Sequence, residues 1–264
     1  MLKNSSIRST VRKLAISAGI YRPGTLTRYM DRSYSERLRQ DMAFYSRLLK
    51  PDSLCFDVGA NIGEKSEALL GIGMKVVAFE PQPVCARELR ARCRHFGEKF
   101  ALCESALGAK AGAALLHVCE NPAVSSFHKD WNGAEATMEV PVTTLDHAIA
   151  LHGRPMFCKI DVEGWELEVL KGLTQSVPLL SIEYVLRERD IQNTMEALDY
   201  LSQFGDLRVN VTPAETLSFA LPEWVSLTQW RSIFPSSFMD REGYYYGDLF
   251  IRTEGTQTSA ASSK

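Results

Sequence analysis

Short apolar runs alternate with longer segments of mixed polarity through most of the chain, beginning after Pro51. The runs LCFDVG (54–59), KVVAFE (75–80) and KFALCES (99–105) predict three buried strands. The segments between them, EKSEALLGIG and the stretch that Pro83 opens, are typical of helices. This β-α-β-α-β order predicts an α/β protein with a parallel sheet and helices on both faces.

The alternation is interrupted at residues 109–145 and then returns. AALLHVCE and TMEVPVTTL predict two strands around a polar loop, which we interpret as an inserted hairpin at the sheet edge. MFCKID (156–161) and PLLSIEYV (178–185) predict the fourth and fifth core strands, each followed by a helix. LRVNV and GDLFIR are candidates for the sixth and seventh strands.

Three segments do not follow this alternation. Residues 1–50 predict a helical, partly amphipathic extension, and residues 51–252 form the predicted domain. Within the domain, residues 212–246 are rich in aromatic side chains, which suit either a lid that contacts substrate or a core and subunit contact. The polar tail at 253–264 has the composition of a disordered segment.

Composition is that of a soluble globular protein, with 45% hydrophobic and 23% charged residues over 264 positions. No apolar run approaches the roughly 20 residues of a membrane helix, and we expect no signal peptide. The six cysteines include no CxxC pair, so we expect no zinc site and no disulfides, and we place the protein in the reducing cytoplasm.

Charge is distributed unevenly along the chain. Residues 1–50 carry +8, from 11 Lys and Arg against 3 Asp and Glu, whereas the whole chain carries −2. A solvated basic helix explains this pattern, and so does attraction to an anionic membrane face or an acidic substrate. No nucleic-acid-binding motif accompanies the charge, so we expect no nucleic-acid partner.

The stretch FDVGANIGEKS (56–66) resembles three kinds of ligand-binding loop. A phosphate-binding loop has four residues between its glycines and a lysine directly after the second, whereas three residues separate Gly59 from Gly63 and Glu64 follows. A GxGxxG dinucleotide loop needs glycine where Asn61 and Glu64 stand, although Glu80 matches its ribose-binding acid. A DxGxNxG loop fits every position.

A ligand with an ammonium group, a carboxylate and a ribose suits this third loop, and S-adenosylmethionine has all three. Asp57 ends the first strand, where an open α/β sheet binds its ligand, and we place it near the ammonium group. The glycines let the backbone approach the ligand, and N–H groups at the helix start meet its carboxylate. Glu80 accepts the ribose hydroxyls. In the alternative, Asp57 only braces the turn.

Five motifs in order, FDVGANIGEKS, VVAFEPQP, VPVTTLD, KIDVEGWELEVLKG and SIEY, resemble the FkbM family of S-adenosylmethionine-dependent methyltransferases over roughly residues 52–185. The resemblance implies a class I methyltransferase (Rossmann-like) fold, whose seven-stranded, mostly parallel sheet has one antiparallel strand near an edge. It also implies O-methylation, often of sugar or polyketide hydroxyls. We assign to the cofactor site Asp57, Gly59, Asn61, Gly63, Glu80, Ala106 and Asp161.

The motif KIDVEGWE (159–166) is the second stretch with candidate chemistry. In the fold that the chain resembles, its strand lies beside the first, so Asp161 faces the methyl donor. Methyl transfer from a sulfonium is an in-line displacement, in which the enzyme aligns the acceptor oxygen and takes up its proton. We assign this role first to Asp161 and second to Glu163. In the alternative, Asp161 only orders the loop and Glu163 caps the helix.

Other polar side chains near these motifs are candidates for supporting roles. His128, in the loop VSSFHKDW, is a third candidate for catalysis, although a single loop histidine is often only exposed. Glu183 is a candidate pocket wall, and with Asp161 and Glu163 it has the oxygen ligands for magnesium. Nothing in the sequence fixes their geometry, so we predict no metal. Glu166 and Glu168 are predicted on a solvated helix face.

The sequence therefore predicts an S-adenosylmethionine-dependent O-methyltransferase with a small-molecule or glycan acceptor. A sugar hydroxyl of a glycan or glycolipid precursor follows from the family resemblance alone. The basic N-terminus would place the enzyme at the inner membrane face. The alternatives are a non-catalytic scaffold with this fold and a nicotinamide-dependent oxidoreductase, and the oligomeric state is not predicted.

Overall fold

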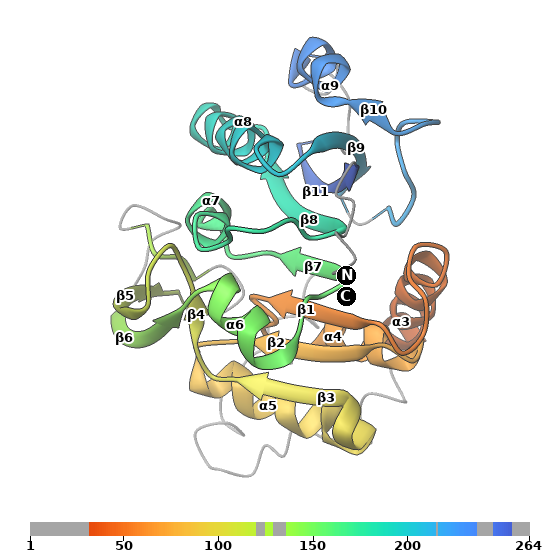
Figure 1. Ribbon diagram of the computed structural model, residues 1–264. Coiled ribbons are helices and arrows are strands. Elements are labelled where there is room, and N and C mark those ends of the chain that lie inside the picture. Colours follow the sequence, from red (N-terminus) through yellow and green to blue (C-terminus); the bar gives the residue numbers. More distant parts are fainter. Residues whose placement is uncertain (1–31, 120–124, 129–135, 215, 237–244, 255–264) are drawn as a thin grey trace, which may run out of the picture.

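The structure is a computed structural model that describes residues 32–119, 125–128, 136–214, 216–236 and 245–254. Figure 1 shows one central sheet with helices on both faces and a smaller sheet beside it. Of the predicted N-terminal extension and C-terminal tail, residues 1–31 and 255–264 lie outside the described residues.

The central sheet contains eight strands among the described residues, in the order β10-β9-β11-β8-β7-β1-β2-β3. All seven predicted strands are present, and the two-residue β10 is the eighth. The long antiparallel strand is β11, which pairs with both β8 and β9, and the short β10 is also antiparallel to β9. The strands are β1 (Leu54–Val58), β2 (Lys75–Phe79), β3 (Phe100–Cys103), β7 (Phe157–Ile160), β8 (Leu179–Val185), β9 (Asp206–Pro213), β10 (Val225–Ser226) and β11 (Tyr246–Glu254).

Two apolar layers join the helices to this sheet, because alternate side chains of each strand point to opposite faces. Phe56 of β1 and Ile160 of β7 face one layer, while Cys55 and Phe157 face the other. The first layer is covered by α6 (Leu145–His152), α7 (Glu166–Leu170), α8 (Glu188–Ser202) and α9 (Leu227–Ile233). The second is covered by α3 (Arg32–Tyr45), α4 (Glu64–Gly71) and α5 (Pro83–Cys93), with the short 3₁₀ helix η1 (Arg94–Lys99) after α5.

Helix α3 confirms the helical extension for the part that the structure describes. Phe44 and Tyr45 are buried in the layer beneath α3 and α4, where burial of each such side chain contributes about 1.5–3 kcal/mol. At the other end of α3, the Tyr34 hydroxyl donates to Glu67 of α4, and Arg92 of α5 reaches the same carboxylate at 3.0 Å. The basic extension therefore continues into the core.

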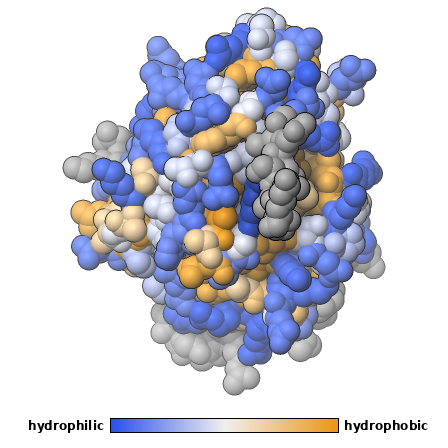
Figure 2. Space-filling view, in the orientation of Figure 1, coloured by the Kyte–Doolittle hydropathy of each residue, from blue (hydrophilic) through white to orange (hydrophobic). Residues whose placement is uncertain are grey.

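A three-stranded sheet lies beyond the carboxyl ends of the parallel strands (Figure 1). It consists of β4 (Ala106–Leu107), β6 (Ala136–Thr143) and β5 (Gly112–Val118), in that order. The antiparallel pairing of β5 with β6 confirms the inserted hairpin. Apolar side chains gather at this sheet in Figure 2, and Leu115 of β5 is 55% exposed.

Most described aromatic residues of the 212–246 segment pack inward. Trp230 of α9 is fully buried and stacks on Phe234 at 4.8 Å between ring centroids. The Arg252 guanidinium lies over the Trp224 ring, with its Cζ 3.8 Å from the ring centroid. Core packing, rather than substrate contact, is thus the role of Trp230 and Phe234. Tyr245 and Tyr246 are exposed, and Phe238 and Tyr244 lie outside the described residues.

Candidate active site

The loop after β1 is shaped by a contact with the neighbouring strand. Gly59 has a φ of +78°, and its N–H donates to the Phe79 carbonyl of β2 at 3.0 Å. A Cβ at Gly59 would stand 1.8 Å from the carbonyl oxygen of Asp161, at the end of β7. Only glycine allows both the left-handed backbone and this approach. The loop after β1 and the turn after β7 therefore meet backbone to backbone.

Asp57 lies beneath this loop, 1% exposed. Its Oδ2 accepts a 2.5 Å hydrogen bond from Ser66 of α4, while its Oδ1 is buried and has no hydrogen-bond partner. Burial raises the pKa of Asp57, and the positive charge of Lys159 opposes the rise. Bracing of the turn and binding of an ammonium group both suit this geometry, because Oδ1 keeps its accepting capacity.

Glu80 follows β2 and is 3% exposed. Its Oε2 accepts from the Asn61 N–H at 2.9 Å, and its Oε1 accepts from the Gln82 N–H at 2.8 Å. Burial raises the pKa of Glu80 to about 7, against the effect of these two bonds. Each oxygen retains a second lone pair, so a pair of ribose hydroxyls can still be bound.

Gly59 and Glu80 line a cleft at the carboxyl edge of the sheet. It is lined by Gly59, Asn61, Glu80, Pro81, Gln82, Leu116, Ser125, Asp161, Val162 and Glu163. Of the other predicted cofactor residues, Gly63 packs against Leu89 of α5, and Ala106 is buried in β4. The inserted hairpin supplies one wall through Leu116 of β5 and through Ser125 between β5 and β6, whose Oγ lies 3.4 Å from Gln82 Oε1. Sequence reasoning missed Leu116.

Glu166 stabilises the turn between β7 and α7, and the prediction of its exposure is wrong. Glu166 was predicted on a solvated helix face, but it is only 8% exposed. Its Oε1 accepts from the N–H groups of Val162 and Gly164 at 3.0 and 3.2 Å. Those bonds stabilise Glu163 and Gly164, which have φ values of +54° and +91°. Residues with positive φ are costly, and this carboxylate offsets the cost.

Lys159 is a second residue that sequence reasoning missed. It is 3% exposed, and its Nζ donates to Asp161 Oδ2 at 2.6 Å. In the sheet register it stands beside Asp57. The carboxylates of Asp161, Asp248 and Asp57 raise the Lys159 pKa, although burial alone would lower it. The signal was available in the sequence, because a lysine inside the apolar run MFCKI needs a buried partner.

Asp161, Glu163 and Glu183 come together from three separate positions, with carboxylate oxygens within 4.8 Å of one another. Burial, and then the negative charge of Asp161, raise the pKa of Glu163 to about 8 and that of Glu183 to about 10. Such a group favours a proton or a cation among its oxygens. The absence of a metal stays a prediction.

His128 lies behind the same turn. Its Nε2 is 2.9 Å from the Gly164 carbonyl oxygen, and its ring packs edge-on against Trp165. The neighbouring Ser126 hydroxyl donates to the Glu163 carbonyl at 2.7 Å. These contacts indicate that His128 and Ser126 support the turn, and neither is among the residues that line the cleft.

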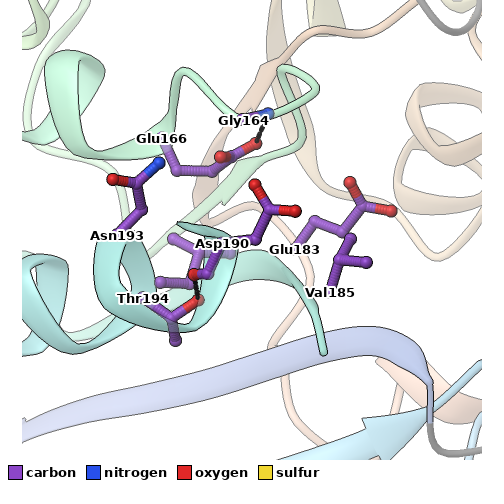
Figure 3. A pocket seen from close by; sticks show the side chains of 8 residues that line it. Gly164, Glu166, Glu183, Val185, Asp190, Asn193 and Thr194 are labelled. Carbon is purple, nitrogen blue, oxygen red and sulfur yellow. Dashed lines mark hydrogen bonds between the residues drawn. The ribbon is translucent and has the colours of Figure 1, made fainter. Parts of the chain in front are cut away.

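A second, smaller pocket adjoins the turn on the side of α8 (Figure 3). Glu166, Glu183 and Asp190 approach it from the turn, from β8 and from α8. Thr194 of α8 donates to the Asp190 carbonyl and closes one side. Glu183 thus lies between this pocket and the Asp161 carboxylate.

An open α/β sheet in this strand order, with a glycine loop after its first strand and an acid after its second, defines a nucleotide-type ligand site at the carboxyl edge. Residues 57–209 match the family described as "Methyltransferase FkbM domain", which is more than half of the chain. The chain therefore belongs to the FkbM methyltransferase domain family. It is an S-adenosylmethionine-dependent methyltransferase with a class I fold, and the nicotinamide alternative is wrong.

Several solved methyltransferase structures are similar to this chain. Precorrin-6y C5,15-methyltransferase from Geobacter metallireducens has 11% identity and a TM-score of 0.43, over 84% of this chain and 87% of that one. A TehB-like methyltransferase from Corynebacterium glutamicum has 9% identity and a TM-score of 0.44, over 84% and 97%. Magnesium protoporphyrin IX methyltransferase from Synechocystis, with bound S-adenosylmethionine, has 10% identity and a TM-score of 0.43, over 84% of this chain and 79% of that one. No curated protein matches the chain.

In the part of the chain that the structure describes, no helix combines the length and apolar character that crossing a membrane requires.

Proposed function

We propose that this methyltransferase transfers the methyl group to a hydroxyl oxygen, and that Asp161 takes up the hydroxyl proton. The observation that carries this proposal is the position of Asp161 on the cleft wall, at the carboxyl end of β7. Its Oδ2 is held by Lys159, while Oδ1 makes no hydrogen bond to any described residue. A hydroxyl is a weak nucleophile, so a carboxylate that can accept its proton assists the transfer.

The remaining residues of the cleft bind and orient the cofactor. S-adenosylmethionine supplies an electrophilic methyl group when it is bound. Glu80 accepts hydrogen bonds from a ribose diol, and the backbone at Gly59 and Asn61 allows close approach to the amino-acid end. The orphaned Asp57 Oδ1 is matched to an ammonium group, directly or through an ordered water. Glu166 stabilises the turn that keeps Asp161 and Glu163 beside these cofactor-binding residues.

The proposed acceptor is a molecule with several hydroxyl groups, such as a sugar of a glycan or glycolipid precursor. The support is a set of carboxyl side chains from the β7–α7 turn, from β8 and from the start of α8, which are Glu163, Glu183 and Asp190. Carboxyl groups accept hydrogen bonds from hydroxyls, and the protonated ones also donate.

Asp161→Asn tests the proposal, with Asp199→Asn on the exposed side of α8 as a control. S-adenosylhomocysteine affinity should stay within about threefold by calorimetry, because the ribose site is intact. Transfer of labelled methyl to glycan and glycolipid fractions should fall about 100- to 10,000-fold. Undiminished transfer in Asp161→Asn would remove it as the base. A wild type that binds no S-adenosylhomocysteine would favour the non-catalytic scaffold.

We also propose that the basic N-terminal region holds the enzyme at an anionic membrane face within the cytoplasm. The support is the net charge of +8 over residues 1–50, of which the structure describes only the last part. Sedimentation with vesicles that contain an anionic lipid should weaken as salt rises from 50 to 500 mM, because salt screens exposed charges. Binding that does not respond to salt would contradict this proposal.

A further inference from the structure

The ion pair between the buried Lys159 and the partly exposed Asp161 is unusual for its place in the sheet. Two residues before Lys159, on the same face of the sheet, the register brings together the apolar residues Cys55, Phe157 and Leu179. Lys159 itself stands between Asp57 and Ser181. Burial of an ammonium group costs several kcal/mol before its partners are counted. An apolar residue would fill this position at lower cost, so the lysine needs another explanation.

Charged and titratable groups approach the ion pair from every element around it. The groups are Asp57 of β1, Glu183 of β8, Asp248 of β11, Glu163 and Glu166 of the turn, Lys65 of α4, Asp41 and Tyr45 of α3, and Arg187 before α8. Lys65 is engaged by Asp41 at 2.5 Å, and Arg187 by Asp190 at 2.7 Å. Among the described residues, Lys159 is therefore the cation in direct contact with Asp161.

Three carboxyl groups within 4.8 Å of one another do not all ionise, because like charges repel at this distance. The negative charge costs least on the member that touches an ammonium group, which is Asp161. Burial raises the pKa values of Glu163 and Glu183, as described above, which favours the proton on these two groups over Asp161.

We propose that Lys159 is a positioning residue, which holds Asp161 through Oδ2 so that Oδ1 carries the negative charge of this group toward the reacting hydroxyl. The proposal rests on the proposed role of Asp161 as the base. Lys159 itself need not touch cofactor or acceptor, since it does not line the cleft. Lys159 acts in two ways. It determines which of the three neighbouring carboxyl groups accepts the proton, and it fixes the orientation of that carboxylate.

A test needs no knowledge of the acceptor, because cofactor analogues probe the position of the methyl group. Sinefungin carries an amine where S-adenosylmethionine carries its methyl-bearing sulfonium, whereas S-adenosylhomocysteine has no charge there. The ratio of the two affinities, measured by calorimetry at pH 7.5, therefore reports a carboxylate at the methyl position. The variants are Asp161→Asn, Lys159→Met, Lys159→Arg and the double variant K159M/D161N. Lys171→Met is the control, because Lys171 pairs with Glu168 at the surface of α7.

The direction in which Lys159→Met changes sinefungin affinity distinguishes a positioning role of Lys159 from a purely electrostatic one. Loss of a nearby positive charge, by itself, tightens the binding of a cationic ligand. Loss of positioning weakens it, and we expect sinefungin to lose about tenfold relative to S-adenosylhomocysteine in both Lys159→Met and Asp161→Asn. In the Asp161→Asn background, Lys159→Met should change nothing more. Lys159→Arg, which keeps the ion pair, should restore most of the ratio.

Each outcome bears on a different claim. If Lys159→Met binds sinefungin as tightly as the wild type or more tightly, while Asp161→Asn does not, only the role of Lys159 is overturned. If Asp161→Asn leaves the ratio unchanged, the base assignment fails and this inference fails with it. If Lys159→Met does not fold, Lys159→Arg and the double variant still decide: a ratio in the double variant that differs from that of Asp161→Asn overturns the coupling.

Discussion

The two halves of the central sheet treat their carboxylates in opposite ways. On the β1–β3 side, Glu80 is satisfied by two backbone N–H groups, and Asp57 accepts from Ser66. On the β7–β8 side, Asp161, Glu163 and Glu183 face one another, and among them the structure gives a side-chain hydrogen bond only to Asp161. The first half is built as a binding site before any ligand arrives. The second half holds electrostatic repulsion that a proton or a ligand relieves.

The halves meet where Gly59 contacts the Asp161 backbone. In the proposed function, the first half binds the cofactor and the second half takes up the proton, so rigid binding and proton uptake fall on separate residues. Three substitutions test this contrast.

The largest effect is expected where the halves touch. Gly59→Ala should lower the free energy of unfolding by at least about 3 kcal/mol, of which about 1–2 come from the backbone conformation and the rest from displacing the Asp161 carbonyl. Urea unfolding measures it. Gly73→Ala is the control, because its φ is +91° but the added Cβ comes no closer than 3.3 Å to any atom, in the Pro51 side chain. Equal losses in the two variants would show that the contact with Asp161 has no cost.

In the cofactor half, Glu80→Gln should weaken S-adenosylhomocysteine binding about 10- to 100-fold, because one accepting oxygen is replaced by a donor. Calorimetry compares it with Glu98→Gln, an exposed acid before β3. Since the Glu80 pKa is raised to about 7, wild-type affinity should also fall as pH drops from 8 to 6 and the carboxylate gains a proton. A wild-type affinity that is flat over this range would contradict the assignment of Glu80 to the ribose.

In the other half, the smallest effect concerns stability. Folded Glu183 keeps its proton up to a pKa of about 10, whereas the unfolded chain releases it near 4.5. The unfolded state is therefore favoured increasingly as pH rises between these values. Glu183→Gln should raise stability at pH 8.5 by about 1 kcal/mol and change little at pH 5. Thermal unfolding at both pH values, with Glu139→Gln on exposed β6 as control, measures this. A loss of stability at pH 8.5 would mean that ionised Glu183 has a partner in the folded protein.

Local pattern was enough where a residue's role depends on its own strand or loop. The glycine spacing after β1 and the acid after β2 were predicted from motifs, and an antiparallel strand near a sheet edge was implied by the family resemblance. Glu166 was misplaced because a helical pattern predicts an exposed acid, whereas the backbone turns just before it and offers two N–H groups. The contribution of Leu116 was missed because a hairpin's position over the sheet depends on packing far along the chain.

The sequence by itself determined the order of strands and helices, the apolar faces and the loop chemistry at the ends of β1 and β7, because these follow from local periodicity and backbone preference. Only the tertiary structure decided which charges are neighbours. Lys159 lies beside Asp57 through strand register, and Glu183 approaches Asp161 through the adjacency of β7 and β8. Repulsion and burial depend on distances between segments remote in sequence, so the protonation pattern of the site is a property of the fold.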